Sequence, residues 1–186
     1  MRIVGGEFRG RALAAPKTND IRPTIDRTRE SLFNIIGHVY PEAIDQTRVL
    51  DLFAGTGAVG LEALSRGCRA ALFVENGVEG RGLLWENIES LGLHGRARIL
   101  RRDATKMGPA NNVEPFQLVF ADPPYGKQLG EAALKAAHEG GWIAPGALAI
   151  VEERADVTVT VDACFKPLES RSFGDTRIEF FRYQRT

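Results

Sequence analysis

The residues best suited to chemistry stand in one short run, Asp122-Pro123-Pro124-Tyr125, directly after an apolar segment that is typical of a strand. A residue before proline is pushed toward an extended conformation, and proline has no N–H to donate. The polar groups of this loop are therefore mainly acceptors, the Asp122 carboxylate and the Pro123 carbonyl. Two such acceptors can bind both N–H groups of an exocyclic base amine and aim its lone pair at an electrophilic methyl group. Tyr125 would stack on that base, which must leave its helix or already be unpaired.

A second run carries glycines between a predicted strand and a predicted helix, Asp51-Leu52-Phe53-Ala54-Gly55-Thr56-Gly57-Ala58-Val59-Gly60. Its G-x-G-x-x-G pattern also occurs in dinucleotide-binding proteins, so a nicotinamide-dependent oxidoreductase is one alternative. The D-x-x-x-G-x-G spacing from Asp51 favours S-adenosylmethionine instead, and the proline loop has no role in hydride transfer. Glycines let the backbone approach a ligand closely, and the helix N-terminus offers N–H groups to the methionine carboxylate. Asp51 can hold the methionine ammonium.

Two further carboxylates follow predicted strands. Glu75 ends the second strand, where it can accept both ribose hydroxyls, and Asp103-Ala104 follows the third, where it can meet the adenine edge. Asp103 has an alternative role as a helix cap before Thr105. Because open α/β sheets bind ligands at the carboxyl ends of their strands, we expect these groups to share one pocket. The expected cofactor-binding residues are Asp51, Phe53, Ala54, Gly55, Gly57, Glu75, Asn76, Asp103, Ala104 and Asp122.

The elements that must position these motifs alternate between strand and helix patterns. Strands are expected at 49–53, 70–74, 97–100, 116–121 and 147–151, with helices after Gly57 and at 78–91 and 129–139. Gly80 and Gly82 weaken the second of these helices. Two final strands, 165–172 and 176–183, are joined by a turn at 173–175. This alternation predicts an α/β fold with a parallel sheet covered on both faces, to which the terminal hairpin adds antiparallel pairing.

The first 25 residues carry four glycine or proline turn signals and little helical periodicity. We expect a short β-hairpin near 3–8 and 11–14, then a loop. A helix capped by Thr24 or Asp26 should follow and end at Pro41, with an apolar stripe formed by Leu32, Ile35, Ile36 and Val39. The chain is expected to be a single domain over residues 1–186, in which 1–25 extend a catalytic core at 26–186.

Charge and composition limit the class of protein. The 186 residues are 44% hydrophobic and 26% charged with no net charge, as in ordinary globular proteins. Residues 1–31 nevertheless hold seven basic and four acidic residues. A basic arm on a neutral body suits a polyanion contacted at one end, although charge alone is equally compatible with a merely solvated arm.

Cysteine, histidine and hydropathy patterns point to a cytoplasmic protein without a metal. Cys68 and Cys164 stand alone and are expected to be buried, reduced thiols, and the three histidines are scattered. No apolar run approaches the roughly 20 residues that span a bilayer, and the first residues lack a secretory apolar stretch. We expect a monomer.

With both motifs in place, the sequence resembles the bacterial 16S ribosomal RNA (guanine(966)-N2)-methyltransferase family over nearly its whole length. The resemblance rests on these segments: Gly6-x-x-Arg9-Gly10-Arg11, Arg22-Pro23-Thr24-x-Asp26-Arg27-x-Arg29-Glu30-x-Leu32-Phe33-Asn34, Asp51–Gly57, Leu61-Glu62-Ala63-Leu64-Ser65-Arg66-Gly67, Val74-Glu75, Asp122–Tyr125 and Gly174-Asp175-Thr176. The sequence departs from the family pattern at Thr56, at Asn76-Gly77 and at Phe173.

The resemblance implies a Rossmann-like class I methyltransferase fold with seven strands and a guanine in assembled small ribosomal subunits as substrate. It assigns Asp122 and Tyr125 to the base, beside the Pro123 carbonyl expected from the loop itself, and it assigns Asp51, Gly55, Gly57, Glu75 and Asp103 to S-adenosylmethionine. It further implies that Arg9, Arg11, Arg22 and Arg27 contact RNA or close over the site. As an alternative, arginines 22, 27 and 29 could pair with Asp20, Asp26 and Glu30 at the helix start.

Two other functions remain open at this point. An adenine-N6 methyltransferase acting on DNA or RNA would use the same Asp-Pro-Pro-Tyr chemistry, although 186 residues leave no room for an added target-recognition domain. A noncatalytic RNA-binding assembly factor could retain the fold. The intact Asp122, Tyr125, Glu75 and glycine turn favour an enzyme over that factor.

Overall fold

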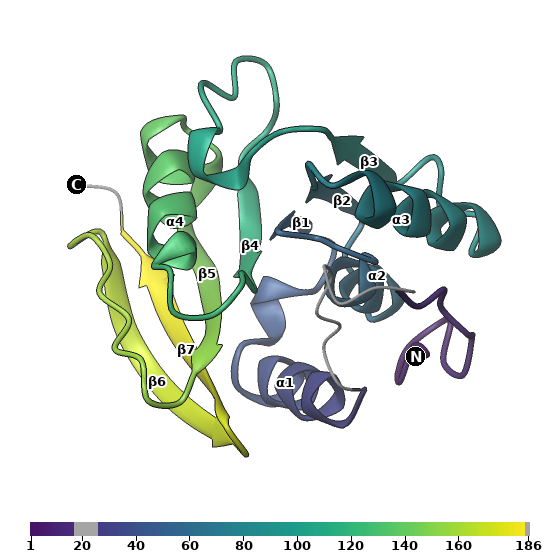
Figure 1. Ribbon diagram of the computed structural model, residues 1–186, viewed down its shortest axis with the longest axis horizontal. Coiled ribbons are helices and arrows are strands. Elements are labelled where there is room, and N and C mark those ends of the chain that lie inside the picture. The colour runs from purple at the N-terminus through teal and green to yellow at the C-terminus, as the bar shows by residue number, and fades with distance from the viewer. Residues whose placement is uncertain (17–25, 185–186) are drawn as a thin grey trace.

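A computed structural model describes residues 1–16 and 26–184 and has one seven-stranded sheet at its centre, in the order β3-β2-β1-β4-β5-β7-β6 (Figure 1). The strands β1 to β5 run parallel, and β7 runs antiparallel to both of its neighbours. This arrangement confirms the predicted α/β sheet with an antiparallel C-terminal hairpin. The strands are β1 (Arg48–Leu52), β2 (Ala70–Val74), β3 (Ala97–Leu100), β4 (Phe116–Ala121), β5 (Ile143–Arg154), β6 (Phe165–Phe173) and β7 (Thr176–Tyr183).

Helices cover both faces of the sheet (Figure 1). α1 (Asp26–Val39), α2 (Ala58–Ser65) and α3 (Val78–Ser90) contribute Phe33, Leu61 and Leu84 to one apolar core. α4 (Leu129–Glu139) and the turn of 3₁₀ helix η2 (Ala104–Lys106) belong to a second core on the opposite face. Pro41 begins another 3₁₀ turn, η1 (Pro41–Ala43), directly after α1, which confirms the predicted helix end.

The order of strands fixes where a ligand can bind. From β1 the chain moves outward to β2 and β3, and it then returns to the other side of β1 to form β4 and β5. The connection after β1 therefore runs to one side of the sheet and the connection after β4 to the other. A crevice forms between them, beyond the carboxyl ends of β1 and β4. Both predicted motifs follow these two strands.

The predicted N-terminal hairpin is wrong in its extent. Residues 1–16 contain a single antiparallel bridge, between Arg2 and Ala12, instead of two paired strands. The backbone N–H groups of Val4 and Gly5 donate to the Glu62 carboxylate of α2. Because these donors are directed at a helix, they are not available to a strand partner, and the arm lies against α2 as an irregular segment.

The buried stripe of α1 and two strand boundaries also differ from the prediction. On α1, Val39 is 50% exposed, whereas Phe33, which was left out of the predicted stripe, is fully buried. β1 ends before Phe53, which has a φ of +59°. β5 begins at Ile143, before the predicted start at Ala147, and its pairing with β4 shifts register between Ile143 and Leu148.

A buried ion pair joins α1 to α2 and to the N-terminal arm. The Nε atom of Arg29 lies 3.2 Å from Glu62 Oε1, and both side chains are fully buried. Arg29 also pairs with Asp26 at 2.9 Å and donates to the Arg2 carbonyl. The alternative in which Arg29 pairs at the helix start is thus confirmed for Asp26, but the expected solvent-exposed setting is wrong. Removing one partner of a buried pair is strongly destabilising, so Arg29 and Glu62 serve the fold.

Candidate active site

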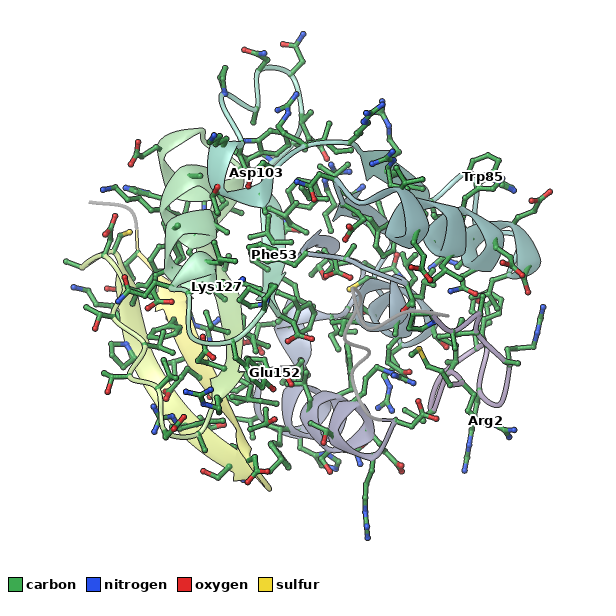
Figure 2. All side chains as sticks on the ribbon, viewed as in Figure 1. Arg2, Phe53, Trp85, Asp103, Lys127 and Glu152 are labelled. Carbon is green, nitrogen blue, oxygen red and sulfur yellow. The ribbon has the colours of Figure 1, made fainter. Side chains whose placement is uncertain are left out.

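A cavity of about 720 Å³ opens at the carboxyl ends of β1 to β4, a volume typical of small-molecule sites. Most of the residues predicted to bind cofactor or base line it. Gly57 does not, since it caps the N-terminus of α2 behind the lining. The predicted residues in the lining are Asp51, Phe53, Ala54, Gly55, Glu75, Asn76, Asp103, Ala104, Asp122, Pro123 and Tyr125. Figure 2 shows Phe53 between Asp103 and Glu152 in this view of the molecule.

The turn after β1 is held in a conformation that few residues adopt. Phe53, Gly55 and Gly57 all have positive φ, at 59°, 55° and 83°. A bulky residue in this region is an outlier, and such strain concentrates at functional sites. A Cβ at Gly57 would also lie 2.3 Å from a methyl carbon of Leu84, so α3 packs closely against the turn.

Asp51 lies almost entirely out of solvent beneath this turn. It is 3% exposed, and its Oδ2 accepts a hydrogen bond of 3.0 Å from the Gly60 N–H. Burial raises the pKa of Asp51 to about 8, the Gly60 bond opposes that rise, and the nearby charges of Asp122 and Glu75 add to it. In the ligand-free protein at neutral pH, Asp51 is therefore mainly protonated, and a cation bound beside it would favour the ionised form.

Glu75 connects the first two strand ends. Its Oε1 accepts from the Gly55 N–H at 2.7 Å, and its Oε2 accepts from the Gly77 N–H at 2.9 Å. These bonds fix the carboxylate at the cavity wall, and each oxygen keeps a lone pair that can accept from a hydroxyl. Gly80 lies directly behind it, because a Cβ there would be 2.9 Å from Glu75 Cδ. The glycine that weakens α3 thus makes room for Glu75.

We predict that Gly80→Ala lowers cofactor affinity about tenfold by moving the Glu75 carboxylate off its two backbone donors. The helix itself should tolerate alanine. Gly82→Ala is the matched control, because a Cβ at Gly82 meets nothing within 4 Å and should only stabilise α3, by about 0.5–1 kcal/mol. Titration calorimetry and thermal melts check both variants. Equal affinities for the two alanine variants would show that the position of Glu75 does not matter.

Asp103 follows β3 and caps η2, which confirms the alternative role considered for it. Its Oδ1 accepts from both the backbone N–H and the hydroxyl of Thr105, at 2.9 and 2.7 Å. These bonds lower the pKa of Asp103, so this carboxylate is ionised at neutral pH. Because Asp103 also lines the cavity, the cap leaves its second oxygen in reach of a ligand, and the two roles are compatible.

The Asp122–Tyr125 loop closes the other side of the cavity. Pro123 is buried, Asp122 and Tyr125 are half-buried, and all three line the cavity. The hydroxyl of Tyr125 lies 2.8 Å from Thr176 Oγ1 and donates to Glu152 Oε1 at 3.2 Å. The tyrosine ring is thus held by its outer end, from strands β7 and β5.

The charge of the cavity lining favours S-adenosylmethionine over a nicotinamide dinucleotide, the two cofactors that the sequence left open. In the part of the chain that the structure describes, five acidic side chains line the cavity, of which Asp51 is mainly protonated before a cation binds, against one arginine, Arg102. This wall repels the pyrophosphate of a dinucleotide and suits a ligand that carries positive charge. The lining carboxylates are Asp51, Glu75, Glu79, Asp103 and Asp122.

Of the arginines predicted to contact RNA, Arg9, Arg11 and Arg27 lie outside the cavity lining. Arg9 and Arg27 are exposed, and Arg11 donates to the Ser90 carbonyl at the end of α3. Arg22 falls outside the described residues. The structure therefore does not bring Arg9, Arg11 or Arg27 together with the Asp122–Tyr125 loop.

Three buried polar residues that contact the site, Asn87, Glu152 and Glu153, were not predicted from the sequence. Asn87 donates to the Thr56 carbonyl of the glycine turn and accepts from the Ala14 N–H. Glu152 and Glu153 contact Tyr125 and Gly126 of the Asp-Pro-Pro-Tyr loop from the end of β5. The rule used for Glu75, a carboxylate directly after a buried strand, applies equally to the acidic pair that follows Ile150-Val151.

Cys68 and Cys164 are buried free thiols, as predicted. Among residues 1–16 and 26–184, no group of three or more His, Cys, Asp or Glu side chains could hold a metal ion. Over the same residues, no helix is both long enough and apolar enough to span a membrane.

Similar proteins carry this architecture. Ribosomal RNA small subunit methyltransferase D of Escherichia coli strain K12 is 38% identical over 156 residues, which are 84% of this chain and 76% of that protein. The Haemophilus influenzae protein of the same name is 32% identical over 94% of this chain and 89% of its own. Among solved structures, Escherichia coli yhhF, described as a methyltransferase, superposes with a TM-score of 0.84 at 32% identity over 100% of this chain and 99% of its own.

A more distant structure shares the fold alone. An RNA methyltransferase from Salinibacter ruber, solved in complex with S-adenosyl-L-homocysteine, is 11% identical, with a TM-score of 0.65 over 89% of this chain and 95% of its own. The Rossmann-like methyltransferase fold predicted from the sequence is thereby confirmed. A family model described as conserved hypothetical protein 95 matches residues 1–182, and the chain belongs to that family.

Proposed function

We propose that this protein transfers a methyl group from S-adenosylmethionine to the exocyclic N2 amine of a guanine in 16S ribosomal RNA of the small subunit. One observation carries the proposal. The acceptor-rich loop Asp122–Tyr125 and the acidic, glycine-containing turn at Asp51–Gly55 line a single cavity. The names and identities of the relatives support ribosomal RNA of the small subunit as the substrate.

The charge of the cavity lining supports S-adenosylmethionine as the cofactor. Its acidic side chains complement the positive charges of a sulfonium and an ammonium. Because Gly80 has no side chain, the Glu75 carboxylate can lie at the cavity wall. Asp51 would hold the ammonium, Glu75 the ribose hydroxyls and Asp103 the adenine edge. Bound S-adenosylmethionine supplies an electrophilic methyl group that is transferred by direct displacement.

The protein's own part is to position the amine. The amine lone pair of a base is delocalised into the ring and is a poor nucleophile. Asp122 Oδ and the Pro123 carbonyl would accept its two N–H groups and favour a tetrahedral nitrogen, so that the lone pair faces the methyl group. Tyr125 bounds the base on one side. Asp122 need not remove a proton before attack, because loss of the sulfonium charge drives the step. The nitrogen that gains the methyl group then gives up one proton, to the Asp122 carboxylate or to water.

The small subunit, rather than free RNA, is the proposed substrate, and the enzyme would act as a monomer in the cytoplasm. RNA would be contacted outside the cavity by the exposed Arg9 and Arg27 and by Arg11, which also donates to the Ser90 carbonyl. Residues 1–25 would form an extension of a single catalytic domain.

The test is transfer of a radiolabelled methyl group by the purified protein. Under-methylated small subunits, protein-free small-subunit RNA and duplex DNA are offered in parallel, and the labelled nucleoside is identified. We expect N2-methylguanosine from the subunits. Labelled N6-methyladenine would retain the amine chemistry but refute the guanine assignment. Cofactor binding without transfer to any substrate would favour the noncatalytic assembly factor.

A further inference from the structure

The tyrosine of the catalytic loop is anchored by residues that the sequence motif does not contain. Its single phenolic proton goes to Glu152 Oε1, so Thr176 is the donor in the 2.8 Å bond to the phenol oxygen. Glu152 is 7% exposed. A carboxylate this deeply buried is costly unless it is hydrogen-bonded, and here it is placed where it receives the tyrosine.

A second carboxylate holds the residue after the tyrosine. Glu153 is 1% exposed, and its Oε1 accepts from the Gly126 N–H at 3.1 Å and from the Arg154 N–H at 2.8 Å. Successive side chains of a strand point to opposite faces. Glu152 and Glu153 therefore reach the same loop from the two faces of β5, and they fix neighbouring residues of it.

The C-terminal hairpin supplies the third contact. Thr176 is the first residue of β7 and pairs with Arg154 across the sheet, two residues beyond Glu152. The turn before it brings Gly174 to a φ of +59° and lets the Asp175 carbonyl accept from the Ala155 N–H. The position of the threonine hydroxyl is thus set by the hairpin turn and by the end of β5 together.

We infer that Glu152 and Thr176 are positioning residues that orient the Tyr125 ring for the acceptor base, while Glu153 holds the adjoining backbone. The inference rests on the proposed function for the identity of the acceptor. It gives the antiparallel hairpin of β6 and β7 a part in base binding that acts through Tyr125. Lys127, which is labelled between Phe53 and Glu152 in the view of Figure 2, belongs to the same loop but is exposed.

Thr176→Val removes the donor to Tyr125 at nearly constant size. We expect kcat/KM for small subunits to fall about three- to tenfold, while cofactor affinity and melting temperature stay unchanged. Glu152→Leu should lower kcat/KM for small subunits by at least the same factor. Glu152→Gln keeps an acceptor oxygen and should retain most of the wild-type activity. Ser170→Ala is the matched control, because it removes a hydroxyl–carboxylate bond, to Glu179, from the exposed part of the same hairpin.

Two measurements separate positioning from a general structural effect. In a Tyr125→Phe background, Thr176→Val should have no further effect on turnover, because both changes remove the same bond. A full, independent loss in that background would overturn the inference.

Hydrogen exchange gives a readout that needs no substrate. The Gly126 amide, protected by Glu153, should exchange faster in Thr176→Val and Glu152→Leu than in the wild type or in Ser170→Ala. Unchanged exchange together with unchanged turnover would refute the positioning role. If the wild type fails to methylate any RNA, the proposed function fails, but the exchange experiment still decides whether these residues seat the loop.

Discussion

Replacing Asp122 with asparagine is expected to reduce methyl transfer by a factor of about 10² to 10³, while the protein still folds and binds S-adenosylmethionine. Asparagine keeps the shape of the side chain and one acceptor oxygen. Its amide, however, puts N–H donors where the substrate amine also presents donors, and the negative charge that balances the developing positive nitrogen is lost. Single-turnover transfer from labelled cofactor to small subunits measures the chemical step directly.

The control for this change is Asp45→Asn, since Asp45 is an exposed aspartate outside the cavity. It should leave single-turnover rates and melting temperature as in the wild type. An Asp122→Asn variant that transfers methyl groups at the wild-type rate would contradict the proposed chemistry, because no other carboxylate belongs to the loop that presents the Pro123 carbonyl.

The sequence predicted the parts of the site that depend on local rules. Glycine at positive φ, proline after a strand and a carboxylate at a strand's end each have a physical signature within a few residues. The elements from β2 to α4 follow such rules and were predicted almost to the residue. For the same reason Asp51, Glu75 and Asp122 could be expected to meet, since the carboxyl ends of parallel strands lie at one edge of a sheet.

The rest depends on contacts between distant segments. The N-terminal arm has the turn residues of a hairpin, but its N–H groups bind Glu62, some 58 residues further on. Arg29 resembles an exposed charge at a helix start until α2 brings Glu62 against it. Asn87 was read only as part of a weak helix, although it links the glycine turn to the arm. A buried polar residue can be recognised from sequence as an interruption of an apolar face, but its partner cannot.

Asp51→Asn should produce the second large effect, a loss of about 10- to 100-fold in cofactor affinity with no loss of fold. The wild-type carboxyl has a pKa of about 8 in the ligand-free protein, against an ordinary value of 3.8. If the cofactor's ammonium binds beside it, the carboxyl ionises, and binding at pH 6.5 should release close to one proton. Calorimetry in buffers of different ionisation enthalpy counts that proton.

The raised pKa of Asp51 also makes the stability of the folded protein depend on pH. Because the folded pKa is raised, the unfolded chain releases this proton at lower pH than the folded protein does. The contribution of Asp51 to stability is therefore complete below about pH 4 and is lost as the pH rises toward 8. Ligand-free Asp51→Asn should show a shallower decline in melting temperature over that range than the wild type.

Asp103→Asn distinguishes the effect of losing a negative charge in the cavity from the effect of proton release by Asp51. Asp103 lines the same cavity, but its pKa is lowered by the Thr105 hydrogen bonds, so it has no proton to release at pH 6.5. Its asparagine variant should bind cofactor more weakly yet still release the Asp51 proton. If the wild type binds without releasing a proton, the ammonium does not lie at Asp51. The buried carboxyl would then act as a neutral hydrogen-bonding partner of Gly60, beneath a cofactor held by Glu75 and Asp103.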